Sequence, residues 1–139
     1  MRKELEEIGF DKQHKFSGIF SRYGFKYSDR NKRYAKPTMV LKDIKIIDNE
    51  GNEVPITDHL WFNLTKGFMN LGILQENEKV YFDGRVTNYQ KGYYSDGVSI
   101  DYKLERPTKI VLDKPLIDES KREHFPKKIG KFVIESIRR

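Results

Sequence analysis

Apolar and polar positions alternate through most of the chain between residues 16 and 112. A period of two is typical of half-buried β-strands. The alternation is cleanest over residues 79–89, where Val80, Phe82 and Val86 fall on one side and polar residues on the other. The pattern predicts five strands, over residues 16–23, 38–47, 53–62, 79–89 and 100–112.

Turn and helix signals separate these strands. The sequence Asp48-Asn-Glu-Gly51 predicts a tight turn and therefore a hairpin between the second and third strands. Residues 65–74 have apolar positions at helical spacing and predict a short helix, with Thr65 or Asn63 as its N-cap. Polar stretches predict surface loops at residues 27–37 and 90–97.

The resulting order is β-β-β-α-β-β, which is the order of a five-stranded OB-fold, a Greek-key barrel. We therefore expect an all-β fold with one short helix, in which residues 14–112 form the barrel and residues 113–139 a C-terminal extension. Residues 1–13 are expected to be a helical or extended N-terminal segment. Within the extension, residues 117–125 favour a short helix and residues 131–137 a strand or a helix. SH3-like barrels fit less well because they lack a helix between strands three and four.

Composition adds a cationic and aromatic surface to this picture. The 139 residues include 27 Lys and Arg against 21 Asp and Glu, a net charge of +6, together with nine Phe, eight Tyr and one Trp. A basic chain favours polyanionic partners, with nucleic acid first among them. The chain has no cysteine, which excludes disulfides, thiolate metal sites and a cysteine nucleophile. A charged start and the lack of a long apolar run predict a cytoplasmic protein with no membrane partner.

The cations concentrate in the predicted loop between the first two strands, where tyrosines are interleaved with them. Lysine and arginine neutralise phosphates, and aromatic rings stack on bases. The alternative is a solvated loop whose charge serves solubility. The candidate nucleic-acid-binding residues of this loop are Lys26, Tyr27, Arg30, Lys32, Arg33, Tyr34 and Lys36.

A second aromatic cluster lies in and beside the predicted loop between strands four and five. Glycine at position 92 allows a turn from which rings project toward an unstacked strand, although some of these rings could instead pack on the barrel rim. The candidate residues here are Tyr89, Lys91, Tyr93 and Tyr94.

Outward positions on the strands supply the remaining candidates. Arg22, Tyr81 and Arg85 are expected on the outer face of the sheet, where they line a groove or are ordinary surface residues. Trp61 is a candidate base-stacking ring, although Leu60 and Phe62 beside it favour a position partly in the core.

The sequence predicts no enzyme, no cofactor and no metal site. His14, His59 and His124 are far apart, and none has a second ligand at metal-binding spacing. Neither glycine-rich phosphate-binding motif is present. Asp83 and Arg85 are the weak alternative, as participants in phosphodiester hydrolysis.

Four segments combine strand patterns with aromatic turns. They are Phe16-Ser-Gly-Ile-Phe-Ser-Arg-Tyr-Gly24, Asp58-His-Leu-Trp-Phe62, Val80-Tyr-Phe-Asp-Gly-Arg-Val86 and Tyr89-Gln-Lys-Gly-Tyr93. Together these segments resemble small OB-fold proteins of phages and mobile elements of low-GC Gram-positive bacteria. This resemblance covers roughly residues 14–112 and implies binding of single-stranded DNA. The basic and apolar residues 127–139 depart from the acidic tail of the common bacterial single-strand-binding proteins.

These observations lead to one principal hypothesis and one rival. The principal hypothesis is a non-enzymatic protein that binds single-stranded DNA, with RNA as a second ligand to test. The rival is a protein-interaction module whose tyrosines and arginines contact a host protein, such as a component of the replication or host-defence machinery. Packing of residues 116–139 on a second subunit would make the protein a homo-oligomer.

Overall fold

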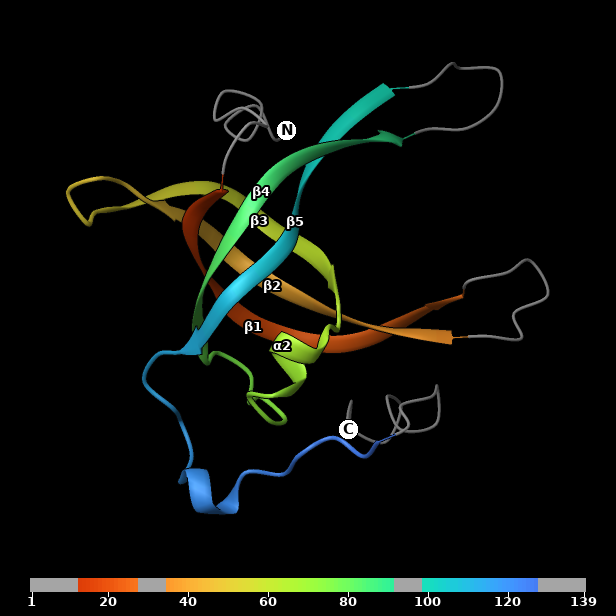
Figure 1. Cartoon of the computed structure of the whole chain (residues 1–139), viewed down its shortest axis with the longest axis vertical. Helices are drawn as coiled ribbons and strands as arrows, with labels where there is room; N and C mark the ends of the chain where they lie inside the picture. The colour runs from red at the N-terminus through yellow and green to blue at the C-terminus, as the bar shows by residue number, and fades with distance from the viewer. Residues whose placement is uncertain (1–12, 28–34, 92–98, 128–139) are drawn as a thin grey trace.

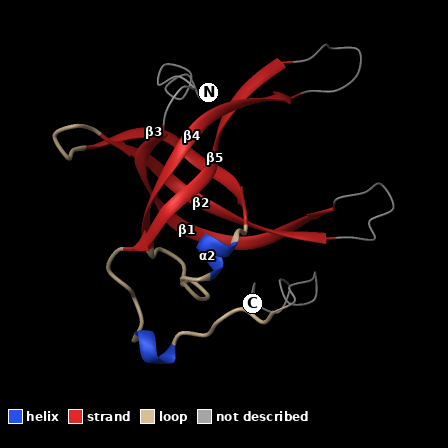
Figure 2. Ribbon diagram, in the orientation of Figure 1, coloured by secondary structure: helices blue, strands red, loops and turns tan. Residues whose placement is uncertain are grey.

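The computed structural model describes residues 13–27, 35–91 and 99–127, with side chains at all of these positions except 88–91 and 99–102. Five strands form one antiparallel sheet in the order β3-β2-β1-β4-β5, and a short helix, α2 (Lys66–Met69), lies between β3 and β4 (Figures 1 and 2). The predicted element order is therefore confirmed. The strands are β1 (Gln13–Tyr27), β2 (Ala35–Ile47), β3 (Glu53–Asn63), β4 (Lys79–Lys91) and β5 (Ser99–Leu112).

The sheet curls strongly, so that its two edge strands, β3 and β5, approach each other. Figure 1 shows β5 crossing the molecule in front of β2 and β3, while the β1–β2 and β4–β5 hairpins extend toward the same side. The curl encloses one apolar core between the strands.

Two hairpins are longer than predicted. Lys26 and Lys36 pair across β1 and β2, so the prediction that they belong to a loop is wrong, as it is for Tyr27. Likewise β4 continues to Lys91, which pairs with Ser99, where a loop was predicted. A projecting hairpin is solvated on both faces, so its strands need no apolar alternation and leave no signal in the hydrophobic pattern.

A β-bulge in β1 decides which side chains enter the core. The register with β2 shifts between Phe20 and Arg22, so Ser21 is an extra residue. A strict period of two from Phe20 would bury Arg22, but the bulge exposes Arg22 and buries Tyr23. The Tyr23 hydroxyl accepts a hydrogen bond from the Leu74 amide at 2.8 Å, and burial raises its pKa above the usual value.

Four phenylalanines from three strands and the helix form the centre of the core. Phe82 stacks on Phe16 at 5.9 Å between ring centroids and meets Phe62 and Phe68 edge-on at 5.5 and 6.3 Å. Gly18 faces this core, and a Cβ there would lie 3.0–3.1 Å from Ile44 and Leu41. A side chain at this position would therefore require Ile44 and Leu41 to shift by a few tenths of an ångström.

The helix is shorter than predicted, four residues instead of ten. Thr65 occupies the N-cap position, but its side chain makes no capping hydrogen bond. Gly67 and Gly72 lower helix stability, and Gly72 has a φ of +86° that ends the helical path. Phe68 nevertheless anchors α2 because it is fully buried.

Residues 113–127 form a strap that runs below the sheet in Figure 1 and forms hydrogen bonds with the segment between α2 and β4. The helix predicted over residues 117–125 is wrong, since only a 3-10 turn, η2 (Glu119–Lys121), forms. Arg122 leaves the turn in an extended conformation and reaches Glu78, so this tertiary contact overrides local helix formation. Farther along, the Phe125 ring meets the Tyr23 ring edge-on at 5.3 Å.

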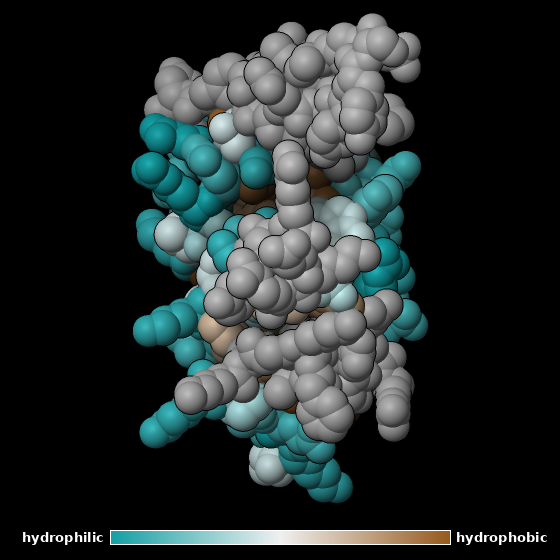
Figure 3. All heavy atoms as spheres, turned by 90° about the vertical axis from the view of Figure 1, so that its right-hand side faces the viewer, coloured by the Kyte–Doolittle hydropathy of each residue, from teal (hydrophilic) through white to brown (hydrophobic). Residues whose placement is uncertain are grey.

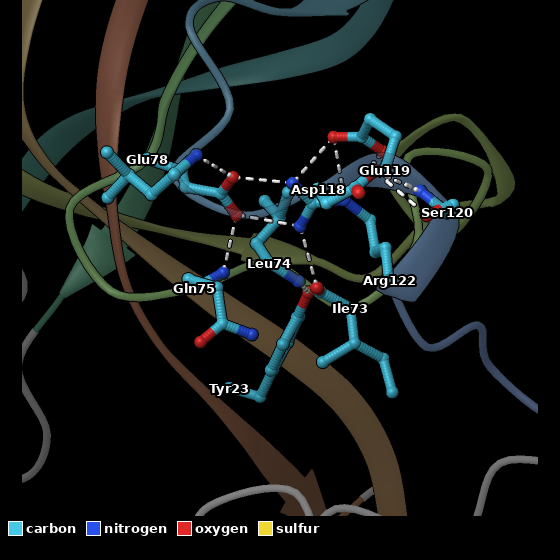
Figure 4. A network of polar contacts seen from close by, with 10 residues as sticks. Tyr23, Ile73, Leu74, Gln75, Glu78, Asp118, Glu119, Ser120 and Arg122 are labelled. Carbon is cyan, nitrogen blue, oxygen red and sulfur yellow. Dashed lines mark hydrogen bonds and ion pairs between the residues drawn. The ribbon is translucent and has the colours of Figure 1, made fainter.

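Arg122 and Glu78 form a buried ion pair (Figure 4). We call this pair, together with Glu119 and the Ile73 carbonyl, the clamp. The guanidinium of Arg122 donates to both carboxylate oxygens of Glu78, to Glu119 and to the Ile73 carbonyl at 2.9 Å. Burial alone would raise the pKa of Glu78. The hydrogen bonds from Arg122 and from two backbone amides outweigh burial and lower that pKa below its usual value.

Within the described part of the chain, no helix has the length and apolar character needed to cross a membrane.

Candidate functional site

A groove of about 590 Å³ lies where the edge strands β3 and β5 approach each other. Most of the lining residues come from β3 and β5, and the others come from β1, β2 and Thr65. Figure 3 views the side toward which the hairpins extend, and hydrophobic atoms are visible there between hydrophilic ones. The lining residues are Phe25, Lys26, Thr38, Leu60, Trp61, Phe62, Asn63, Thr65, Lys103, Leu104, Glu105, Arg106 and Pro107.

The groove combines apolar walls with a charged rim. Leu60 and Leu104, both nearly fully buried, face it from opposite strands. The charged lining residues are three cations, Lys26, Lys103 and Arg106, and one carboxylate, Glu105. Such a site offers an apolar contact to a flat ring together with net positive charge for an anion.

Trp61 stands at the rim of the groove as an exposed aromatic ring. It alternates with the buried Leu60 and Phe62, and 47% of its surface is exposed. The edge of its six-membered ring lies against Gly24, where a Cβ would be 3.4 Å away, and the guanidinium of Arg22 lies 5.2 Å from the ring centroid. Of the two alternatives from the sequence, the structure therefore favours the exposed ring over the core position.

The β1–β2 hairpin carries two further cations, and one of them, Lys26, lines the groove. Lys26 and Lys36 pair directly across the two strands, and both are exposed. Neither has a carboxylate partner among the described residues. Like charges directly opposite each other destabilise a hairpin, so this pair creates a position where an anion would be favourable.

Two buried hydroxyls among the lining residues lack hydrogen-bond partners. These are Oγ1 of Thr38 and Oγ1 of Thr65, and Thr38 is only 3% exposed. A buried hydroxyl without a partner costs about 1–3 kcal/mol. The fold therefore leaves polar atoms unsatisfied at this end of the sheet.

Tyr81 lies at a different place from Trp61. It pairs with Ser17, nine residues before Lys26 on β1, a separation of about 30 Å along the strand. The ammonium groups of Lys79 and Lys15 lie 5.1 and 5.6 Å from its ring centroid. The structure therefore does not bring Tyr81 together with the groove.

The carboxylate of Glu53 organises the surroundings of Tyr81. It accepts hydrogen bonds from Lys79 and Ser17 at 2.8 Å each, and these hold its pKa below the usual value. Of the two cations beside Tyr81, Lys79 is thus already paired with a carboxylate of the chain.

Arg85 lies beside the groove, on β4 directly opposite Glu105, which lines the groove. Its Nε is buried without a hydrogen-bond partner. Arg85 is therefore one strand away from the lining, and it flanks the groove without being part of it.

The remaining candidates lie outside the described residues or have side chains outside them. Arg30, Lys32, Arg33, Tyr34, Tyr93 and Tyr94 lie outside the description, as do the side chains of Tyr89 and Lys91.

Sequence reasoning missed the contribution of β5 to the groove, namely Lys103, Glu105 and Arg106. Pro107 was the available signal, because a proline inside a strand marks an edge or a bulge. Both are found here, since β5 is an edge strand and its register with β4 shifts at this point.

The described residues contain no group of three or more histidine, aspartate or glutamate side chains that could hold a metal ion. Asp83, the weak catalytic candidate, forms a long ion pair of 3.7 Å with the exposed Lys109. Comparison with protein families, with curated proteins and with solved structures finds no match to this chain.

Proposed function

We propose that the curled sheet is a partly open OB-fold barrel and that the chain is a non-enzymatic protein that binds single-stranded DNA. The strand order supports the barrel, because β3-β2-β1-β4-β5 is the order that a five-stranded OB-fold barrel would have if it were opened between β3 and β5. In such barrels the β2–β3 face and the loops joining β1–β2 and β4–β5 bind oligonucleotides. The groove and the two projecting hairpins occupy that position.

One observation carries the proposal, namely an exposed ring beside cations that lack partners. Trp61 offers a flat surface for stacking, and Lys26 and Lys36 stand on the neighbouring hairpin without carboxylate partners among the described residues. A single strand needs both features, because its phosphates require neutralisation and its unstacked bases require aromatic faces.

The same features favour a single strand over a duplex. Bases in a duplex hide their faces in the stack, so an exposed tryptophan gains little from them. Duplex recognition commonly places a helix in the major groove. The only α-helix among the described residues has four residues and is anchored in the core through Phe68.

The test is a titration of fluorescent oligonucleotides followed by anisotropy, with single-stranded and duplex DNA and RNA at several salt concentrations. We expect single-stranded DNA to bind most tightly, with an affinity that falls as salt rises. The double variant Lys26→Gln/Lys36→Gln should reduce the slope of log K against log salt by about 1.4, since each lost phosphate contact contributes about 0.7.

A matched control removes two charges elsewhere. Lys114 and Lys121 are both exposed and lie on the strap, away from the groove lining. Lys114→Gln/Lys121→Gln changes the net charge equally and should leave the slope nearly unchanged. Equal loss in both double variants would mean that binding follows net charge alone. Absence of binding at low salt would favour the protein-interaction module.

A further inference from the structure

β5 carries a bulge beside the groove. The register between β4 and β5 shifts by one residue between the pairs Asp83–Thr108 and Arg85–Glu105. Two residues of β5, Arg106 and Pro107, therefore lie opposite the single residue Gly84. Arg106 has a φ of 50°, a left-handed conformation that residues other than glycine rarely adopt. The strand therefore holds a strained residue at the edge of the candidate site.

The bulge changes where neighbouring side chains go. In a regular strand, consecutive residues face opposite sides of the sheet, but Glu105 and Arg106 both line the groove. Neither forms an ion pair with another residue in the described ranges. The groove thus contains a carboxylate acceptor and a guanidinium donor side by side, both available to a ligand.

A carboxylate in this position argues against a groove for phosphates alone, because Glu105 would repel them. A base is different, since it presents donors and acceptors on one rigid ring. Leu60 and Leu104 supply apolar walls for such a ring, and Trp61 stands at the rim. The volume of about 590 Å³ is within the usual 300–1,000 Å³ of small-ligand sites.

We infer that this groove binds a guanine base of the single strand, an inference that rests on the proposed function. Guanine presents two acceptors, O6 and N7, which match the forked donors of Arg106. It also presents two donors, N1–H and the 2-amino group, which match the carboxylate of Glu105. Adenine lacks the O6 acceptor and the N1–H donor, cytosine lacks the pair of adjacent donors, and thymine lacks both pairs.

The experiment compares oligothymidylate strands of equal length that differ in one central base, with dG, dA, inosine or dT at that position. A single guanine avoids guanine quadruplexes. We expect the dG strand to bind about fivefold or more tightly than the dT strand, with inosine intermediate because it lacks the 2-amino group.

Two variants test the named residues and a third serves as their control. Arg106→Gly keeps a residue suited to positive φ while removing the guanidinium, and Glu105→Gln keeps the shape while removing the charge. Both should abolish the preference for guanine. Lys109→Gly removes a cation from another left-handed position on β5, with φ of 49°, outside the groove lining, and should retain the preference.

The possible outcomes distinguish a failure of guanine recognition from a failure of the proposed single-strand binding. Equal affinity for all four strands, or a guanine preference that survives in Arg106→Gly and Glu105→Gln, overturns guanine recognition while leaving single-strand binding intact. Failure to bind any strand overturns the proposed function and this inference with it.

Discussion

Two arginines illustrate the difference between the clamp and the groove. Arg122 is 4% exposed, and its guanidinium is satisfied by two carboxylates and a backbone carbonyl. Arg106 is exposed, has a left-handed backbone and forms no ion pair with another described residue. A guanidinium whose donors are used within the chain holds the fold together, whereas one with unused donors is available to a ligand.

The same distinction extends to the surrounding polar atoms. In the clamp, both oxygens of Glu78 accept several hydrogen bonds, and the carboxylate is fully buried. Around the groove, the hydroxyls of Thr38 and Thr65 have no partner. Residue type alone therefore does not separate the two regions, whereas the hydrogen bonding of Arg122 and Glu78 differs from that of Arg106, Thr38 and Thr65.

The largest expected effect is on stability, from breaking the clamp. Glu78→Gln leaves the buried Arg122 without its principal countercharge, and loss of one partner of a buried ion pair costs about 3–5 kcal/mol. We expect the free energy of unfolding, measured by urea denaturation at neutral pH, to fall by about that amount. Once folded, the variant should bind single-stranded DNA with nearly the affinity of the unchanged protein.

A matched control comes from the second carboxylate on the same arginine. Glu119 is about half exposed, so Glu119→Gln should lower the free energy of unfolding much less than Glu78→Gln does. The pKa of Glu78 is lowered in the folded state, so its contribution exists above the unfolded value of about 4.3 and is lost as pH falls through the lower folded value. The stability gap between Glu78→Gln and the unchanged protein should narrow over that acid range. Equal losses in the two variants would contradict a clamp centred on Glu78.

The next largest effect is on binding, from removing the exposed ring. Trp61→Leu eliminates the stacking surface, and stacking contributes about 1–3 kcal/mol per base. We expect the affinity for single-stranded DNA to fall about 5- to 100-fold in anisotropy titrations. The salt slope should not change, because the substitution removes no charge. A variant that binds normally would show that Trp61 is a surface residue without a role in the site.

Much of the fold could be predicted because alternation follows from burial on one face of a sheet. The strand over residues 79–89 was predicted well, since its apolar side chains face a continuous core. The hairpin extensions at Lys26 and Lys91 were not, because solvated strands carry no apolar signal. The bulge at Ser21 depends on pairing with β2, a contact that no local pattern encodes.

The candidate site was predictable in its types of residue and less so in their positions. Lys26 and Trp61, which the sequence identified as a basic and an aromatic candidate, both line the groove. Tyr81 is also an aromatic candidate, but its partner on β1, Ser17, is about 30 Å along that strand from Lys26, and only the register reveals this separation. Glu78 and Arg122 are 44 residues apart, and nothing in the sequence marks them as partners.

The smallest expected effect comes from Tyr81, which serves as the matched control for Trp61. Both are aromatic residues facing outward from the sheet, and both have cations over their rings. Beside Tyr81, however, Lys79 is already held by Glu53 at 2.6 Å. Tyr81→Leu should therefore change the affinity for single-stranded DNA by less than about twofold, while the loss of its cation–π contacts lowers stability by about 0.5–1 kcal/mol. Both quantities can be measured on one preparation, by anisotropy and by urea denaturation. A loss of affinity as large as that of Trp61→Leu would mean that the strand follows β4 as well as the groove, and that ligand binding releases Lys79 from Glu53.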